Sequence, residues 1–160
     1  MFFGQFILNL LIALLWLLLK DEPTPTLPTF ITGFLVGIGI LYIMHRFFGT
    51  QFYLVRVVKI IKLILIFFRE LVVSGVVVIK LILSPKLNIT PGIFKYKTIL
   101  EDDWEVTTLS LLLTLTPGSV VMEVSESGDE LYIHAMDMKQ KDDLIRSLGR
   151  FETAIMEVSR

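Results

Sequence analysis

The pattern of hydrophobic and polar positions changes abruptly near residue 84 of this 160-residue chain. Residues 2–19 carry no charged side chain, and a second uncharged run covers residues 23–44. Both runs approach roughly 20 apolar residues, the length at which an α-helix crosses a bilayer. The start of the second run holds three prolines: Pro23, Pro25 and Pro28. Because proline interrupts a helix, the pattern predicts a transmembrane helical hairpin over residues 1–48 whose second helix begins near Pro28.

A longer segment of different character follows, over residues 49–84. At 100° per residue, its charged side chains fall within a sector of roughly 140° on an otherwise apolar helix. These are Arg56, Lys59, Lys62, Arg69, Glu70 and Lys80. A charge at the bilayer centre costs about 2.5–3.5 kcal/mol. We therefore expect a basic amphipathic helix in the cytoplasmic interface, its charged stripe toward anionic lipid headgroups and water. The alternative is a third span whose stripe faces a partner protein.

Residues 85–160 have the pattern of a water-soluble domain. Residues 93–97 predict a strand, with a shorter extended piece at residues 87–90. A helix then follows, with the negative charge of residues 101–103 at its start, where Asp102 or Asp103 can cap it, and it contains the apolar run 109–115. Pro117 and Gly118 end this helix in a structural turn, because proline cannot continue it and glycine adopts turn conformations.

The last part of the chain predicts a hairpin and a final helix. Alternating positions at 120–124 and 131–135 predict two strands, joined by a turn at residues 126–129. Residues 139–158 place one apolar face at helical spacing, made by Leu144, Leu148, Phe151, Ile155 and Val158. The fold class is therefore an α+β membrane protein whose soluble part has the order β-α-β-β-α, with a small sheet covered by helices on one side.

Composition and charge support a membrane protein and suggest its orientation. Hydrophobic residues make up 54% of the chain, and its mean hydropathy is +0.72. Residues 45–86 hold seven Lys or Arg against one acid, whereas residues 87–160 hold seven against thirteen. Since basic loops stay in the cytoplasm, we expect both ends of the hairpin and the C-terminal domain to be cytoplasmic. A cleaved signal peptide fits poorly, because no positive charge precedes the first apolar run and no small-residue cleavage pattern follows it.

Small residues in the second predicted span suggest close helix packing. Gly33 and Gly37 are four residues apart, which places them on one helix face and allows a neighbouring backbone to approach. The first span carries two amides, Gln5 and Asn9. Each either bonds to a neighbouring helix or lies near the membrane interface.

Four segments together resemble the MrpE (MnhE) component of the Mrp multisubunit cation/proton antiporters. They are Arg46-Phe47-Phe48, Pro91-Gly92-Ile93-Phe94, Thr114-Leu115-Thr116-Pro117-Gly118 and Leu131-Tyr132-Ile133-His134-Ala135. The resemblance covers essentially the whole chain. It implies a bacterial plasma-membrane complex that expels sodium, and in some members potassium, in exchange for protons, with MrpE as an accessory component beside larger ion-conducting subunits.

The residues themselves agree with an accessory role. Ion and proton relays through a bilayer need ionisable side chains at depth, and the two predicted spans have none. Glu70 is expected to meet water or form a structural ion pair rather than act as a relay, because basic neighbours on the stripe favour its charged form. His134 alternates with Tyr132 on a strand and has no second ligand placed to complete a metal site. His45 lies at the end of a span, where an interfacial role is expected.

We expect no enzyme activity, cofactor or bound metal. The chain has no cysteine, which removes thiol catalysis and thiolate metal sites, and it has no glycine-rich phosphate loop. Nucleic-acid binding is disfavoured because the hydrophobic back of the basic helix commits it to lipid. A second hypothesis is a membrane-tethered adaptor whose acidic cytoplasmic domain recruits a soluble partner. Co-assembly with polytopic membrane proteins distinguishes an antiporter component from this adaptor.

Overall fold

The computed structural model describes residues 2–20, 26–48, 52–86 and 89–160. The chain divides into two compact units, which we call the N-terminal unit (Met1–Val58) and the C-terminal unit (Lys59–Arg160). Each has its own packing. Helix α3 (Tyr53–Ile82) begins in the first unit and continues in the second.

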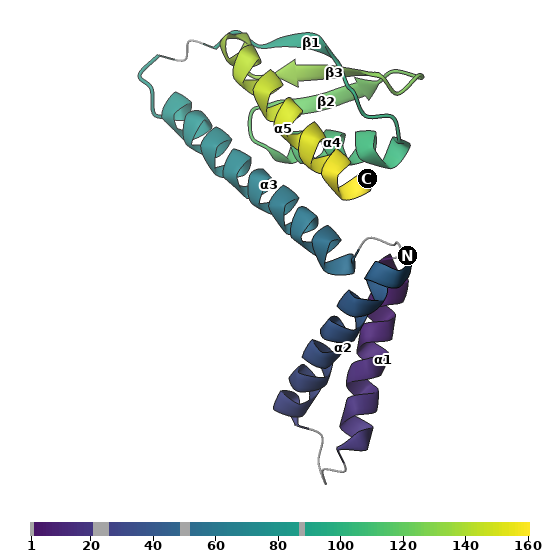
Figure 1. Ribbon diagram of the computed structural model, residues 1–160. Helices are drawn as coiled ribbons and strands as arrows, with labels where there is room; N and C mark the ends of the chain where they lie inside the picture. The colour runs from purple at the N-terminus through teal and green to yellow at the C-terminus, as the bar shows by residue number, and fades with distance from the viewer. Residues whose placement is uncertain (1, 21–25, 49–51, 87–88) are drawn as a thin grey trace. The chain divides into compact units, whose positions relative to one another are not determined.

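The N-terminal unit is built on two antiparallel helices, α1 (Phe2–Leu19) and α2 (Leu27–Phe48), packed along their length (Figure 1). Helix α2 begins one residue before Pro28, close to the predicted start, and proline is well tolerated in a first helical turn. The predicted turn residues Pro23 and Pro25 lie outside the described residues.

One helix in the described part of the chain, Leu27–Phe47, is long and apolar enough by itself to cross a membrane. Helix α1 contains an apolar stretch, Phe3–Leu19, that falls short of this length. Helix α3 is longer than either, at 30 residues, but carries the charged stripe. Membrane character in the described residues is therefore strongest in α2.

The C-terminal unit contains the β-α-β-β-α order that the sequence predicts. Its elements after α3 are β1 (Gly92–Lys97), α4 (Asp103–Leu115), β2 (Ser119–Val124), β3 (Glu130–Ala135), a short 3₁₀ helix η1 (Met138–Gln140) and α5 (Lys141–Ser159). The three strands form an antiparallel sheet in the order β1-β3-β2. The extended piece expected at residues 87–90 is not a strand at 89–90, and its first two residues lie outside the described part of the chain.

Strand β2 departs from the simple alternation that its sequence suggests. Its register with β3 shifts between Val121 and Glu123, so Met122 is the extra residue of a β-bulge. A bulge bends the strand and redirects a side chain. Val120, Met122 and Val124 are all exposed, and of the three valines in β2 it is Val121 that packs against the core.

The core of the C-terminal unit lies between the sheet and the helices. Leu148, Phe151 and Ile155 of α5 are fully buried, and they pack with α4 and with the inward side chains of β1 and β3. Leu144 and Val158, which the pattern placed on the same face, are only half-buried. Glycine at position 118 has φ +99°, a conformation that few other residues adopt, so it forms the turn that leads from α4 into β2.

Helix α3 supplies a further layer of this core. Leu63, Ile66 and Phe67 pack against the buried cluster of the domain. At 100° per residue these side chains lie on the same side of the helix as the charged stripe. The stripe was expected to face lipid headgroups and water, and this part of it faces the chain's own domain instead.

Candidate functional site

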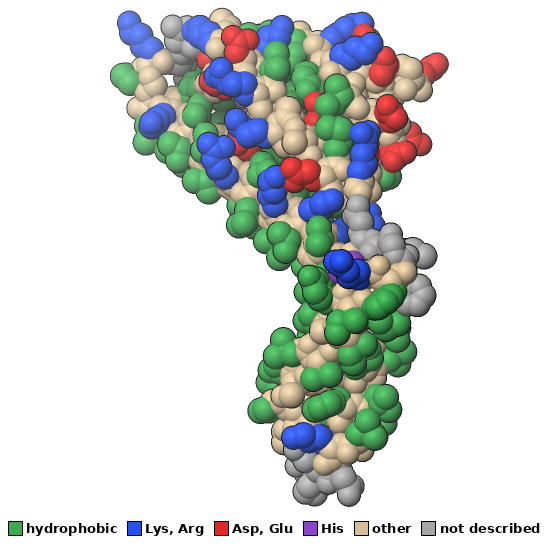
Figure 2. Space-filling view, viewed as in Figure 1, with side chains coloured by type: hydrophobic (Ala, Val, Ile, Leu, Met, Phe, Trp, Pro, Cys, Tyr) green, Lys and Arg blue, Asp and Glu red, His purple; other side chains and the backbone are tan. Residues whose placement is uncertain are grey.

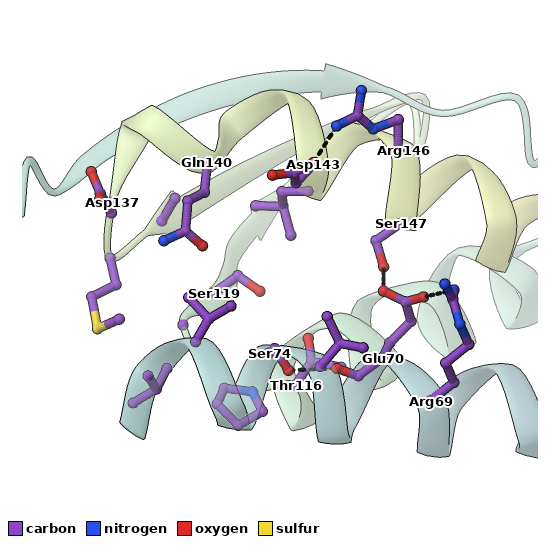
Figure 3. A pocket seen from close by; sticks show the side chains of 18 of the residues that line it. Arg69, Glu70, Ser74, Thr116, Ser119, Asp137, Gln140, Asp143, Arg146 and Ser147 are labelled. Atoms are coloured by element: carbon purple, nitrogen blue, oxygen red, sulfur yellow. Dashed lines mark hydrogen bonds and ion pairs between the residues drawn. The ribbon is translucent and has the colours of Figure 1, made fainter. Parts of the chain in front are cut away.

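The C-terminal half of α3 presents a buried carboxylate to α5. The Glu70 side chain is only 9% exposed; its Oε1 accepts a hydrogen bond from Nη1 of Arg69 and forms an ion pair with Nη2 of Arg150, both at 2.9 Å. Its Oε2 accepts from the Ser147 hydroxyl at 2.7 Å (Figure 3). A buried carboxylate is tolerated only when paired and hydrogen-bonded, and Glu70 satisfies both conditions. The sequence left open whether Glu70 meets water or forms a structural ion pair, and in the structure it forms the ion pair.

A second ion pair joins the same two helices nearer the start of α3. Nζ of Lys62 donates to both carboxylate oxygens of Glu157 at 2.7 Å. Because these side chains are 53% and 36% exposed, the pair contributes at most about 1 kcal/mol. Lys62 and Glu70 therefore both form ion pairs within the chain. Of the other stripe residues, Arg69 and Lys80 are exposed, Lys59 is half-buried, and Arg56 belongs to the N-terminal unit.

A cavity of about 380 Å³ lies beside Glu70 (Figure 3). Its walls come from α3, from the turn at Pro117 and Gly118, from the end of β3, and from α5. The turn is fixed by a hydrogen bond of 2.8 Å from the Met136 amide to the Gly118 carbonyl. The charged side chains at this cavity have partners within the domain: Glu70 pairs with Arg150 and Arg146 with Asp143, and Asp137 is held by hydrogen bonds. This pairing suits a structural joint better than a reactive centre.

Another buried carboxylate ties α5 to β1. Glu152 is 3% exposed and accepts hydrogen bonds from the hydroxyls of Tyr96 and Thr98, at 2.8 and 2.6 Å, and from the Ile99 amide at 3.2 Å. Burial, together with this carboxylate, raises the pKa of the Tyr96 hydroxyl well above its usual value. Tyr96 therefore stays protonated and continues to donate to Glu152 over the physiological pH range.

The loop after β3 contains an acidic residue with a structural task. Asp137 Oδ1 accepts from the Thr90 hydroxyl at 2.9 Å and from the Lys139 amide at 3.2 Å. Burial acts to raise the pKa of this carboxyl, but the hydrogen bonds from Lys139 and Thr90 outweigh it and lower the pKa. Asp137 thereby holds the segment before β1 against the start of η1.

In the N-terminal unit, the two amides of α1 contact the first turn of α3. The Nδ2 of Asn9 donates to the Tyr53 hydroxyl at 2.7 Å, and Oε1 of Gln5 accepts from the Tyr53 backbone amide at 2.8 Å. The Phe6 ring meets the Tyr53 ring edge-on, with centroids 6.4 Å apart. The sequence left open whether these amides bond to a neighbouring helix or lie near the membrane interface, and in the structure both bond to a neighbouring helix.

The two predicted packing glycines lie where α1 and α2 approach. A Cβ at Gly33 would lie 2.7 Å from Cβ of Trp16, and one at Gly37 would lie 1.9 Å from Oδ1 of Asn9. Cβ atoms essentially never approach so closely. Both positions therefore require glycine for the observed packing.

The histidines do not form a site. The described residues contain no group of three or more His, Cys, Asp or Glu side chains that could hold a metal ion. His134 is half-buried on β3 and pairs across the sheet with Ile93 on one side and Val120 on the other. His45 contacts the Tyr42 carbonyl through Nδ1, and its ring lies tilted against the Phe52 ring.

The sequence did not reveal the contacts that organise these sites. Glu70 and Ser147 are 77 positions apart, and Asn9 and Tyr53 are 44 apart. The only local signal is that Ser147 and Arg150 are three residues apart on α5, which places them on one helix face. The sequence showed a charged stripe on the helix that became α3, but it did not show that residues of α5 face this stripe.

Comparison with known proteins identifies the family. A family model described as a Na⁺/H⁺ ion antiporter subunit matches residues 9–158. The E subunit of the Na⁺/H⁺ antiporter of Bacillus subtilis (strain 168) is 49% identical over 157 residues, which cover 98% of each chain. The chain belongs to the MrpE (MnhE) family of Na⁺/H⁺ antiporter subunits. The E subunit of the Na⁺/H⁺ antiporter of Alkalihalophilus pseudofirmus is 43% identical, again over 98% of each chain.

Two solved structures are also similar to this MrpE-family chain. A chain of the Mrp complex from Dietzia sp. is 31% identical and has a TM-score of 0.46; the match covers 63% of the present chain and 96% of that one. A chain of an archaeal membrane-bound sulfane sulfur reductase is 24% identical with a TM-score of 0.54, covering 94% and 98%. The latter likeness concerns the fold alone. Antiport, ion transport and membership of a membrane-bound multisubunit complex follow from the family.

Proposed function

We propose that this chain is a non-conducting structural and assembly subunit of its antiporter complex. The observation that carries the proposal is the absence of acidic and basic side chains along α1 and α2 until His45 and Arg46 in the last turn of α2. A pathway for protons or cations through a bilayer needs such groups at depth. The buried carboxylates Glu70 and Glu152 lie instead in the C-terminal unit, and both are hydrogen-bonded by side chains of the same domain.

In this proposal α1 and α2 form a transmembrane hairpin, and the rest of α3 lies in the cytoplasmic interface. Support comes from the side of α3 opposite Glu70, where large apolar side chains are exposed. They are Ile61, Ile64, Leu65, Phe68, Val72, Val76 and Ile79. Figure 2 shows hydrophobic side chains along α3 beside the charged surface of the C-terminal unit. An amphipathic helix with one face on a domain and the other apolar face uncovered suits a bilayer surface with anionic headgroups.

The topology has a direct test, because the chain has no native cysteine. The substitutions Thr26→Cys and Ser127→Cys place single thiols beside the start of α2 and in the turn between β2 and β3. With an impermeant maleimide on intact cells, we expect Thr26→Cys to react and Ser127→Cys to react only after the cells are opened. Labelling of Ser127→Cys in intact cells would place the domain outside and make α3 a third span.

The non-conducting role is tested by activity in membrane vesicles. Deleting the chain should abolish assembly or exchange, whereas Glu70→Gln and His134→Asn should each retain appreciable sodium/proton exchange. Purification of the tagged protein in mild detergent should recover large polytopic partners. Complete loss of exchange by either variant in an intact complex would contradict the proposal, and recovery with soluble proteins alone would favour the membrane-tethered adaptor.

A further inference from the structure

The C-terminal unit exposes an apolar groove that its own fold leaves uncovered. The groove, about 590 Å³ in volume, lies between α4 and the edge strand β2, which run side by side (Figure 1). Leu111 of α4 and Met122 of β2 line it and are 58% and 60% exposed. Val124 in the groove and Leu115 at the end of α4 extend the patch, at 38% and 61% exposed. Clustered exposed apolar side chains of this size on a soluble domain mark an interaction surface.

The local structure of β2 is what builds this groove. The β-bulge lies at Met122, whose exposed side chain lines the groove, and bulges commonly redirect side chains next to functional sites. Methionine also adapts its shape to a binding partner better than branched apolar residues do. The groove therefore combines one fixed wall, α4, with one adaptable side chain.

The charge of the groove indicates what kind of partner fits it. Among the described residues, those that line the groove include Asp103, Glu123 and Glu126 but no Lys or Arg. None of the three acids has an ion pair within the described part of the chain. These three acids form an acidic rim on the groove, which attracts a cationic partner and repels the anionic lipid surface of the inner leaflet. It also disfavours a second copy of this chain, which would present the same acidic rim.

The backbone of β2 indicates how the partner binds. The Val121 amide already donates to the Thr114 hydroxyl of α4, at 3.3 Å, and the bulge interrupts the regular ladder. Addition of a further strand at this edge is therefore disfavoured, and side chains would make the contacts. We propose that the α4–β2 groove binds a segment of another subunit of the antiporter complex, in which apolar side chains are flanked by Lys or Arg. This inference rests on the proposed assembly function.

The first experiment is photo-cross-linking in the complete complex. A p-benzoylphenylalanine is placed at Leu111, and as a matched control at Ile93, which is 57% exposed on the uncovered face of the sheet. We expect the probe at 111 to form an adduct with one other subunit and the probe at 93 to form none with that subunit. Adducts at 111 with lipid only, with a second copy only, or with nothing would overturn the proposal.

The second experiment separates the apolar and charged contributions. The double variant Leu111→Ser/Met122→Ser should weaken retention of the partner subunit roughly tenfold, the loss expected for truncating central interface side chains. Glu123→Lys/Glu126→Lys should also weaken it, with the difference from wild type shrinking at high salt. Ile93→Ser should retain the partner as wild type does. Equal retention of the partner subunit by all variants would overturn the proposed binding role of the groove. A wild-type chain that recovers no antiporter subunit would overturn the proposed assembly function as well.

Discussion

The N-terminal and C-terminal units bury opposite kinds of residue. In the C-terminal unit the fully buried side chains are mostly large and apolar, such as Leu109, Ile133 and Phe151. In the helix pair the fully buried side chains are Asn9 and Ala13, while Leu11 and Leu15 of α1 are each 55% exposed. One unit is organised around a hydrophobic core, and the other turns its large apolar side chains outward.

The difference is the one expected if, as proposed, the helix pair lies in lipid and the C-terminal unit lies in water. In water, burying large apolar side chains supplies most of the stability, so they gather inside. Lipid is as apolar as leucine, so a helix pair in a bilayer gains nothing by hiding leucine and depends on close packing and hydrogen bonds. Figure 2 agrees, since on the face it shows the charged side chains gather over the C-terminal unit and the helix pair is largely hydrophobic.

The strongest test of this contrast is to remove a large side chain from the core of the C-terminal unit. Phe151→Ala should destabilise that unit by about 3–5 kcal/mol, because Phe151 is fully buried and the cavity cannot collapse completely. Hydrogen exchange on the full chain in detergent should show faster exchange in residues 89–160 and little change in residues 2–48. The control Ile93→Ala should change stability by less than about 0.5 kcal/mol. Equal loosening of both units would mean that they do not unfold separately.

The matching test in the helix pair adds a side chain instead of removing one. Gly37→Val should destabilise the pair by about 1–3 kcal/mol, since even its Cβ would overlap Oδ1 of Asn9. Gly39→Val is the control, because a Cβ there meets nothing within 4 Å. Both variants can be measured by thermal unfolding of the helix pair in detergent, monitored through the hydrogen-exchange protection of residues 2–48. Similar results for Gly37→Val and Gly39→Val would contradict the close packing of α1 and α2.

The elements of both units could be predicted from the sequence, whereas their contacts could not. Periodicity placed β1, β3 and α5 within about two residues of their observed bounds, because alternation and helical spacing are local properties. The bulge at Met122 was missed, since a single inserted residue leaves no trace in a short alternating run. The charged stripe was assigned to lipid because the sequence does not say that Arg150 and Ser147 face Glu70.

A prediction of intermediate size concerns the partly buried hydrogen bond that joins β1 to α5. Tyr96→Phe should cost roughly 1.5 kcal/mol, because the bond it removes ends on a charged carboxylate, Glu152. Since folding raises the pKa of Tyr96, its contribution is complete below about pH 10, the usual tyrosine value, and is lost as the pH rises toward the folded-state pKa. Stability of the wild-type domain should therefore fall in alkali. Tyr96→Phe should lack this part of the fall, whereas the control Tyr132→Phe should keep it.

The smallest predicted effect lies in the N-terminal unit, where one of the hydrogen bonds between α1 and α3 uses the Tyr53 hydroxyl. Tyr53→Phe removes the hydroxyl that accepts from Nδ2 of Asn9 but keeps the ring against Phe6. Hydrogen bonds between membrane helices average about 0.6 kcal/mol, so we expect a loss of that size, clearly below the loss for Tyr96→Phe. The paired variant Asn9→Leu/Tyr53→Phe should not lose a second increment for the same bond, which a double-mutant cycle in detergent measures. A loss of several kcal/mol would instead mean that this hydrogen bond, and not close packing, is what mainly stabilises the N-terminal unit.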